Sequence, residues 1–148
     1  METYSSTPID QMKLDKDLNG LVKVLQQSDE FLKKEAVRAM GQVGTPACIK
    51  YLEKALKDEY PSVRAVALQS IGTLGSHDEN TIPEDRIKEN IVNLLHDKNW
   101  TVRYAAVESL SLLYGEESLD DITPFLLDEN PHVKEAVFQA MDNFRKEK

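Results

Sequence analysis

Cysteine is nearly absent from this sequence. Its 148 residues contain one cysteine, Cys48, so no intramolecular disulfide and no metal site built from several cysteines can form. A chain without disulfides suits a reducing compartment, and we expect a cytoplasmic location. Cys48 lies between Ala47 and Ile49 near the expected start of a helix. We interpret it as a small core side chain, with a thiol activated by the helix N-terminus as the alternative.

Other features are also missing. Glycine and proline number six each, too few for a turn-rich all-β chain. No apolar stretch approaches the roughly 18 residues that span a bilayer, and the N-terminus lacks the basic start and apolar run of a signal peptide. The net charge is −8, and the longest basic cluster, FRKEK, is interrupted by Glu147. We therefore expect no nucleic-acid partner and no membrane partner.

Catalytic motifs are absent from the sequence as well. It contains no G-x-S-x-G, no P-loop and no dinucleotide-binding fingerprint. The histidines, His77, His96 and His132, form no pair four residues apart, and none is followed by glutamate. We expect them to be solvated turn residues. The sequence therefore predicts no catalytic residues, no metal and no cofactor.

What the sequence does contain is one pattern repeated along the chain. DEYPSVRAVALQSIG begins at Asp58, DKNWTVRYAAVESLS at Asp97 and DENPHVKEAVFQAMD at Asp128, and a degenerate copy, QSDEFLKKEAVRAMG, begins at Gln27. The apolar residue before each basic position serves as a reference. These reference residues are Leu32, Val63, Val102 and Val133, spaced by 31, 39 and 31 residues. The longer middle spacing indicates an insertion of about eight residues in the polar stretch 75–83, which we expect to be a surface loop.

Each copy predicts two helices. Apolar residues recur 11, 8 and 7 positions before the reference residue, and again 4, 5 and 8 positions after it, which places them on helical stripes. A helix pair cannot bury its stripe alone, whereas stacked copies bury one another. We therefore predict an all-α chain with a short, partly ordered N-terminal arm (1–16) and a repeat domain (17–148). Its units are 17–44, 45–75, 84–115 and 116–146.

Proline and glycine positions support these boundaries. Pro61 and Pro131 suit the first turn of a second helix, where a missing N–H costs nothing. Pro124 falls inside the first helix of the last unit, where we expect a kink or a helix that begins only at Thr123. Five glycines fall where the second helices are expected to stop: Gly41, Gly44, Gly72, Gly75 and Gly115.

The pattern D-x-x-[P]-x-V-[RK]-x-x-A, with its period near 31, resembles the HEAT-like repeats also found in phycobilin lyases. The resemblance extends from about Leu18 to Phe144 and implies a right-handed α–α superhelix, an armadillo-like solenoid of about four helix pairs. HEAT-like metal hydroxylases share this fold but carry repeated His-Glu pairs, which are absent here. The resemblance indicates little about function because the family includes scaffolds, adaptors and enzymes.

The resemblance also implies a polar ladder in which the acid in one unit's turn meets the base of a neighbouring unit. The residues are Asp58, Asp97 and Asp128 as acids, and Arg64, Arg103 and Lys134 as bases. The first unit departs from the pattern, since Gln27 replaces the acid while Lys33 keeps the base. A catalytic role is the alternative, but a structural role better explains why the pair recurs.

The resemblance further places the second helices on the concave side. Their exposed positions, two and six residues after the reference, are Lys34, Arg38, Ala65, Gln69, Tyr104, Glu108, Glu135 and Gln139. Tyr104 is of a type favoured as an interface anchor; the alternative is an ordinary solvated surface. We predict a non-enzymatic scaffold or adaptor that binds a protein partner through this concave face. The alternative is a bilin-lyase-like enzyme or subunit that handles a tetrapyrrole chromophore.

The C-terminal helix raises a separate question. It carries Val137, Phe138, Met141 and Phe144, although no further unit follows in this sequence to cover them. We expect the phenylalanines to fold back toward Phe125 and Leu126 of the same unit. The alternative is coverage by another molecule, for example in a homodimer through this end.

Overall fold

The computed structural model describes residues 6–27, 29–77, 82 and 84–147, and the regular structure in this part of the chain is helical throughout. The α-helices are α1 (Ser6–Leu14), α2 (Leu18–Leu25), α3 (Glu30–Val43), α4 (Ile49–Ala55), α5 (Pro61–His77), α6 (Glu84–Leu94), α7 (Trp100–Tyr114), α8 (Leu119–Ile122) and α9 (Pro131–Lys146). Short 3₁₀ helices are η1 (Pro46–Cys48), η3 (Gly115–Ser118) and η4 (Thr123–Leu127).

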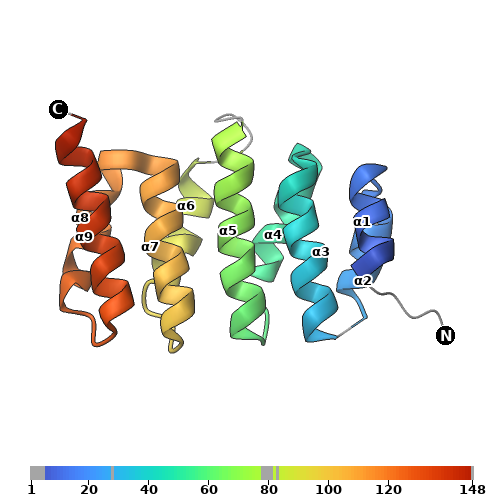
Figure 1. Ribbon diagram of the computed structural model, residues 1–148, viewed down its shortest axis with the longest axis horizontal. Helices are drawn as coiled ribbons and strands as arrows, with labels where there is room; N and C mark the ends of the chain where they lie inside the picture. Colours follow the sequence, from blue (N-terminus) through green and yellow to red (C-terminus); the bar gives the residue numbers. More distant parts are fainter. Residues whose placement is uncertain (1–5, 28, 78–81, 83, 148) are drawn as a thin grey trace.

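The helices stack as pairs in two layers, which confirms the predicted solenoid. The second helices α3, α5, α7 and α9 stand side by side in one row, and the first helices lie behind them (Figure 1). Each second helix packs against the second helix of the next unit. The repeated sequence therefore has a structural meaning: one face of a copy covers the preceding unit and the opposite face supports the next.

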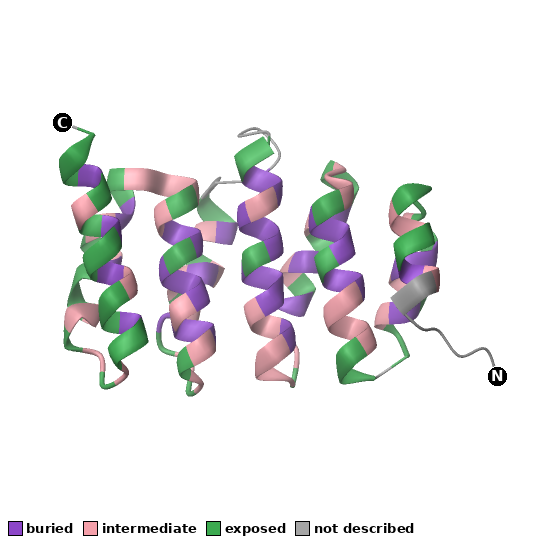
Figure 2. Cartoon of the chain, viewed as in Figure 1, coloured by how far each residue is buried: buried purple, intermediate pink, exposed green. Residues whose placement is uncertain are grey.

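The predicted apolar stripes form the core. Val37, Leu68 and Val107, which occupy equivalent positions in the first three units, are each 0% exposed. Buried residues follow the lines where neighbouring helices touch (Figure 2). This burial follows from the helical spacing, because residues four or five positions after the reference residue project toward the adjacent helix.

The N-terminal segment is more structured than the predicted arm. Residues Ser6–Leu14 form α1, which packs against α3 and buries Ile9. In Figure 1 this helix stands beside α3 at the N-terminal end of the stack. The repeat pattern could not reveal it, because α1 has no second copy in the sequence to align with.

Three of the five predicted helix-stopping glycines lie inside helices, which corrects that expectation. Gly44 (φ +74°) and Gly115 (φ +54°) do end α3 and α7. Gly41 lies within α3, however, and Gly72 and Gly75 lie within α5. A Cβ at Gly41 would approach the Cβ of Ser70 to 2.7 Å. This glycine therefore allows α3 and α5 to pack closely, which is a different task from ending a helix.

The expectation at Pro124 was a kink or a helix that begins only at Thr123, and the structure shows a break in the α-helix at Thr123. Helix α8 ends at Ile122, and η4 (Thr123–Leu127) replaces the continuation of the α-helix, with the proline in its first turn. The predicted loop 75–83 is wrong at its start, because residues 75–77 belong to α5; 78–81 and 83 lie outside the described residues. Ile82 is buried in the core, so this position is not part of a purely external loop.

Candidate functional site

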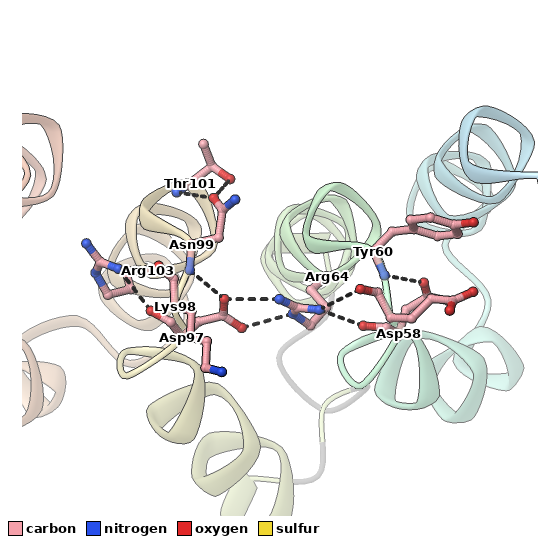
Figure 3. Close-up of polar contacts among 9 residues, drawn as sticks. Asp58, Tyr60, Arg64, Asp97, Lys98, Asn99, Thr101 and Arg103 are labelled. Atoms are coloured by element: carbon pink, nitrogen blue, oxygen red, sulfur yellow. Dashed lines mark hydrogen bonds and ion pairs between the residues drawn. The ribbon is translucent and has the colours of Figure 1, made fainter.

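Two arginines connect successive units in the same way. The guanidinium of Arg64 donates to both carboxylate oxygens of Asp97, at 2.9 and 3.1 Å, and also to the carbonyl oxygen of Asp58 at 2.7 Å. Arg103 repeats this geometry with Asp128, at 2.9 and 3.1 Å, and with the carbonyl oxygen of Asp97 at 2.9 Å. Figure 3 shows Arg64 between Asp58 and Asp97, with Arg103 beside the turn that carries Asp97. Such bidentate pairs are stronger and more directional than single ion pairs.

We call each acid–base pair of the ladder a rung. In the first rung the base is lysine. Lys33 Nζ lies 3.2 Å from Asp58 Oδ2 and also 5.2 Å from the centre of the Tyr60 ring. The base of each unit thus reaches the acid of the following unit, and this direction explains why Gln27 can replace the acid in the first copy. Lys134 stands in the base position of the last unit and makes no ion pair among the described residues.

Each ladder aspartate also fixes its own turn. Oδ1 of Asp58, Asp97 and Asp128 accepts the backbone N–H two residues later, at 2.9 Å in each case. The side-chain caps of the second helices come from other residues: Asn99 accepts from the N–H of Thr101, and Asn130 from that of His132. These two asparagines were not predicted as caps, although asparagine is a favoured N-cap.

The surroundings of Asp128 favour its charged form. Burial by itself raises the pKa of this carboxyl group. Hydrogen bonds from Arg103 and from the Asn130 amide, together with the charges of Arg103 and Lys134, outweigh burial and hold the pKa below the ordinary value of 3.8. The rung is therefore an ion pair at neutral pH, and we assign the ladder a structural role.

A groove opens on the row of second helices, mainly between α7 and α9. Its volume is about 870 Å³. It brings together most of the predicted binding residues, namely Gln69, Tyr104, Glu108, Glu135 and Gln139. Lys34, Arg38 and Ala65 lie outside it; Arg38 instead pairs with Glu35 on its own helix. The predicted binding residues are thus divided: those of the last two units line the groove together with Gln69, whereas those of the first unit do not.

The polar side chains in the groove are acidic or neutral. Glu108, Glu135 and Glu147 line it, and no lysine or arginine is among the described residues that do so. Gln139 Nε2 donates to Glu135 Oε1 at 2.8 Å. A hydrogen bond from the Tyr104 hydroxyl to Glu108, with smaller contributions from burial and the Glu108 charge, raises the pKa of Tyr104. This arrangement attracts cations and repels anions.

Aromatic rings extend one end of the groove. His132, which lines it, stacks on Trp100 with ring centres 5.0 Å apart. The rings of Trp100 and Tyr104 meet edge to face, with centres 6.4 Å apart. We expected His132 to be a solvated turn residue. His132 is exposed and also lines the groove, where its ring contacts Trp100 of the preceding unit; the repeat pattern does not indicate this position. Leu112, 60% exposed, was also missed; it supplies apolar surface.

The end of α9 contradicts one expectation. Phe144 is buried, but Phe138 is 55% exposed and Met141 36% exposed. Phe138 therefore does not fold back onto η4, although its equivalents Val37, Leu68 and Val107 are covered by the next unit. The aromatic ring has no following helix in the described chain to pack against.

The described residues show neither a metal site nor a membrane span. No group of three or more His, Cys, Asp or Glu side chains among them could hold a metal ion. None of the helices described is both long and apolar enough to cross a bilayer. Cys48 is fully buried, with its sulfur 3.2 Å from the Thr45 hydroxyl oxygen, so it occupies a core position.

The stacked helix pairs and the repeated ladder are typical of a HEAT-like α-solenoid. Residues 2–145 match the family described as the adaptin N terminal region, and the chain belongs to that family. Among solved structures, it is similar to the complex of CpcE and CpcF of phycocyanin lyase from Nostoc sp. (TM-score 0.76, 20% identity, covering 92% of this chain and 86% of that one). A designed armadillo repeat protein in complex with the peptide (KR)4 is similar with a TM-score of 0.64, 22% identity and coverage of 95% and 69%.

Two curated relatives are enzymes or enzyme subunits by name. A deoxyhypusine hydroxylase from Neurospora crassa is 31% identical over 67% of this chain and 29% of its own length. A phycocyanobilin lyase subunit beta from Nostoc sp. is 28% identical over 60% of this chain and 48% of its own length. The chain thus spans about three tenths of the hydroxylase and about half of the lyase subunit.

Proposed function

We propose that this protein is a non-enzymatic scaffold that binds a basic, extended segment of a partner protein in the groove between α7 and α9. The observation that carries the proposal is the composition of the groove. Exposed carboxylates of Glu108, Glu135 and Glu147 line it together with Tyr104, and no lysine or arginine side chain among the described residues neutralises them there.

The chemistry of a basic segment fits both parts of this surface. Lysine and arginine side chains pair with exposed carboxylates, and each such pair contributes about 0.2–1 kcal/mol. Their cationic heads also lie favourably over aromatic rings such as Trp100 and Tyr104. The net charge of −8 adds a longer-range attraction that speeds association with a basic partner.

The structural neighbours support the same class of ligand. One similar solenoid is a designed armadillo repeat protein that binds the peptide (KR)4, and another is part of a two-protein complex. A peptide of alternating lysine and arginine is therefore a suitable first probe for this groove. A natural partner would present such residues in an exposed, extended segment.

Fluorescence anisotropy with labelled (KR)4 tests the proposal. The double variant Glu108→Gln/Glu135→Gln should weaken binding about tenfold, because two pairs of about 0.5–1 kcal/mol each are lost. The control, Glu59→Gln/Glu89→Gln, removes the same charge from exposed positions outside the groove lining and should change the affinity less than about twofold. Equal losses in both variants would show non-specific attraction, and no binding to the wild type would reject the proposal.

A bilin-lyase-like role is the second candidate, and the likeness to the CpcE–CpcF complex favours it. A tetrapyrrole needs a wide apolar cleft and cationic partners for its propionates, whereas the groove is lined by carboxylates. For this reason we rank it second. Incubation with phycocyanobilin decides the matter: a shift in the visible absorption of the pigment, lost in Tyr104→Ala, would favour the lyase-like role.

A further inference from the structure

A second, smaller pocket lies between the first helices α2 and α4, at the junction of the first and second units. Its volume is about 250 Å³, below the roughly 300–1,000 Å³ of sites for drug-sized ligands. In Figure 1 these two helices lie behind the row of second helices that carries the groove. We call this site the junction pocket. It is separate from the groove, since no described residue lines both.

The walls of the junction pocket are apolar. Helix α2 contributes Val22 and Leu25, and α4 contributes Ala55 and the ring of Tyr51. Val22, Leu25 and Tyr51 are partly buried and pack against the core, so their positions are held by the fold. An apolar group of a ligand is favoured between such walls, because contact with them removes hydrocarbon surface from water.

Polar groups at the same pocket are available to a ligand. Lys54, the Tyr51 hydroxyl and the Gln26 side-chain amide all line it, and none of the three bonds another group among the described residues. Lysine offers three N–H donors and no acceptor, and the tyrosine hydroxyl and the glutamine amide can also donate. The pocket therefore combines apolar walls with several hydrogen-bond donors.

Lys33, which also lines the pocket, has more donors available than the bases of the other rungs. Arg64 and Arg103 each make four hydrogen bonds, two to an aspartate and two to backbone carbonyl oxygens. Lys33 makes one among the described residues, to Asp58, although its side chain is only 13% exposed. Two of the three N–H donors of its ammonium group are therefore left for a ligand.

The charges that line the junction pocket favour an anion. Lys33 and Lys54 are two cations, and Asp58 is the one carboxylate among the described lining residues. Both oxygens of Asp58 are already engaged, since Oδ2 accepts from Lys33 and Oδ1 accepts from the N–H of Tyr60. The acid is thus neutralised within its rung, whereas the charge of Lys54 is not paired.

The surroundings of α4 are basic, although the whole chain is acidic. Lys50, Lys54 and Lys57 are exposed on this helix and in the residues that follow it. The acid of α4, Glu53, forms an ion pair with Arg86 at 2.7 Å. An anion that approaches α4 therefore meets a favourable local field, which the net charge of −8 does not indicate.

We propose that the junction pocket binds a small aliphatic carboxylate. Its hydrocarbon part lies between α2 and α4, and its carboxylate accepts hydrogen bonds from Lys33 and Lys54. Bonds between an ammonium group and a carboxylate are charge-assisted and stronger than neutral ones. A hydrocarbon part of a few carbons fits the small volume, whereas a long fatty-acid tail does not. This site is additional to the groove and does not depend on the ligand proposed there.

An NMR titration of the ¹⁵N-labelled protein with sodium hexanoate tests the site. Saturable amide shifts should centre on Val22, Tyr51 and Lys54, with a dissociation constant on the order of 1 mM for a ligand of this size. Hexylamine, which has the same chain and the opposite charge, and acetate, which lacks the chain, should bind there at least fivefold more weakly. An absence of saturable shifts at ten times this concentration, or equal binding of hexylamine there, overturns the proposal.

Lys33→Arg tests the role of the lysine without a change of charge. An arginine here should bond both oxygens of Asp58, as Arg64 and Arg103 bond their aspartates. Its donors are then used within the rung, so hexanoate should bind at least fivefold more weakly. Lys34→Arg makes the same exchange at the next residue, outside the pocket lining, and should bind like the wild type. Unchanged affinity in Lys33→Arg overturns the assignment.

A second pair of variants leaves the rung intact. Lys54→Gln should weaken hexanoate binding about threefold, because one exposed ion pair is lost. Lys57→Gln removes the same charge from a residue outside the lining and should leave the affinity nearly unchanged. Circular dichroism checks that all four variants remain helical. Equal losses in Lys54→Gln and Lys57→Gln would show attraction by the general field of α4, and would overturn the placement of the carboxylate in the pocket.

Discussion

Arg103 shows how one side chain holds several segments of this molecule together. Its guanidinium bonds both oxygens of Asp128 and the carbonyl oxygens of Asp97 and Lys98, while its side chain is nearly buried. A buried ion pair adds little net stability when compared with a well-packed apolar pair. Removal of one partner is costly, however, because it leaves the other charge without compensation. The ladder therefore makes the stacking register specific.

We predict that Asp97→Ala lowers the free energy of unfolding by about 1–3 kcal/mol, because Arg64 and the Asn99 amide lose their acceptor. Glu108→Ala, at an exposed position, should change it by less than about 0.5 kcal/mol. Urea denaturation of the two variants measures both values. Equal and negligible losses would show that the ladder does not stabilise the fold.

The pH dependence of stability should reveal the rung at Asp128. The pKa of this carboxyl group is lower in the folded chain than its ordinary value of 3.8. Its contribution is therefore fully present well above 3.8 and is lost as the pH falls through the folded pKa. Asp128→Asn should flatten the fall in stability at acid pH, whereas Glu129→Gln, at a more exposed neighbour, should not. Urea midpoints from pH 7 to 3 provide the comparison.

At the scale of the elements, neighbouring second helices pack closely against one another. Small residues recur at the contacts: Gly41 meets Ser70, and Gly72 lies near Ser109, whose hydroxyl donates to the carbonyl oxygen of Leu68 at 2.9 Å. Glycine inside a helix costs stability relative to alanine, by about 0.5–1 kcal/mol. Its presence here is explained by the space that the facing helix occupies.

We predict that Gly41→Ala destabilises the protein by about 1–3 kcal/mol, despite the better helix propensity of alanine, because the new methyl group would overlap Ser70. Gln42→Ala, at the exposed next position, should change stability by less than about 0.5 kcal/mol. Thermal and urea unfolding measure the difference. A stabilised Gly41→Ala variant would mean that α3 and α5 separate easily.

The sequence could predict the helix pairs from the spacing of apolar residues, and the resemblance to HEAT-like repeats implied the ladder partners. It could not distinguish a glycine that ends a helix from one that permits helix contact, because Gly41 and Gly44 fall within one turn of each other. It identified Tyr104 and Glu135 from their exposed positions. The groove is also lined by His132 and Leu112. Which residues lie opposite them depends on the angle at which α7 and α9 stack, and the spacing of residues in the sequence does not determine that angle.

At the scale of the whole molecule, the first unit and the last two units differ in the charge that they carry on the row of second helices. The first unit carries Lys34 and Arg38 on its row of second helices, whereas the last two units carry the carboxylates of the groove. Under the proposed function, these carboxylates would draw a basic segment toward α7 and α9. The groove lies toward the C-terminal end of the stack.

The most direct test of the account is an NMR titration of the ¹⁵N-labelled protein with (KR)4. The account predicts amide shifts concentrated at Tyr104, Glu108, Glu135 and Gln139, weakened as salt concentration rises because exposed charges are screened. Amides of α1 and α3 should remain unchanged. An absence of shifts at any peptide concentration, or shifts centred on α3 in place of α7 and α9, would contradict the assignment of this groove as the binding site.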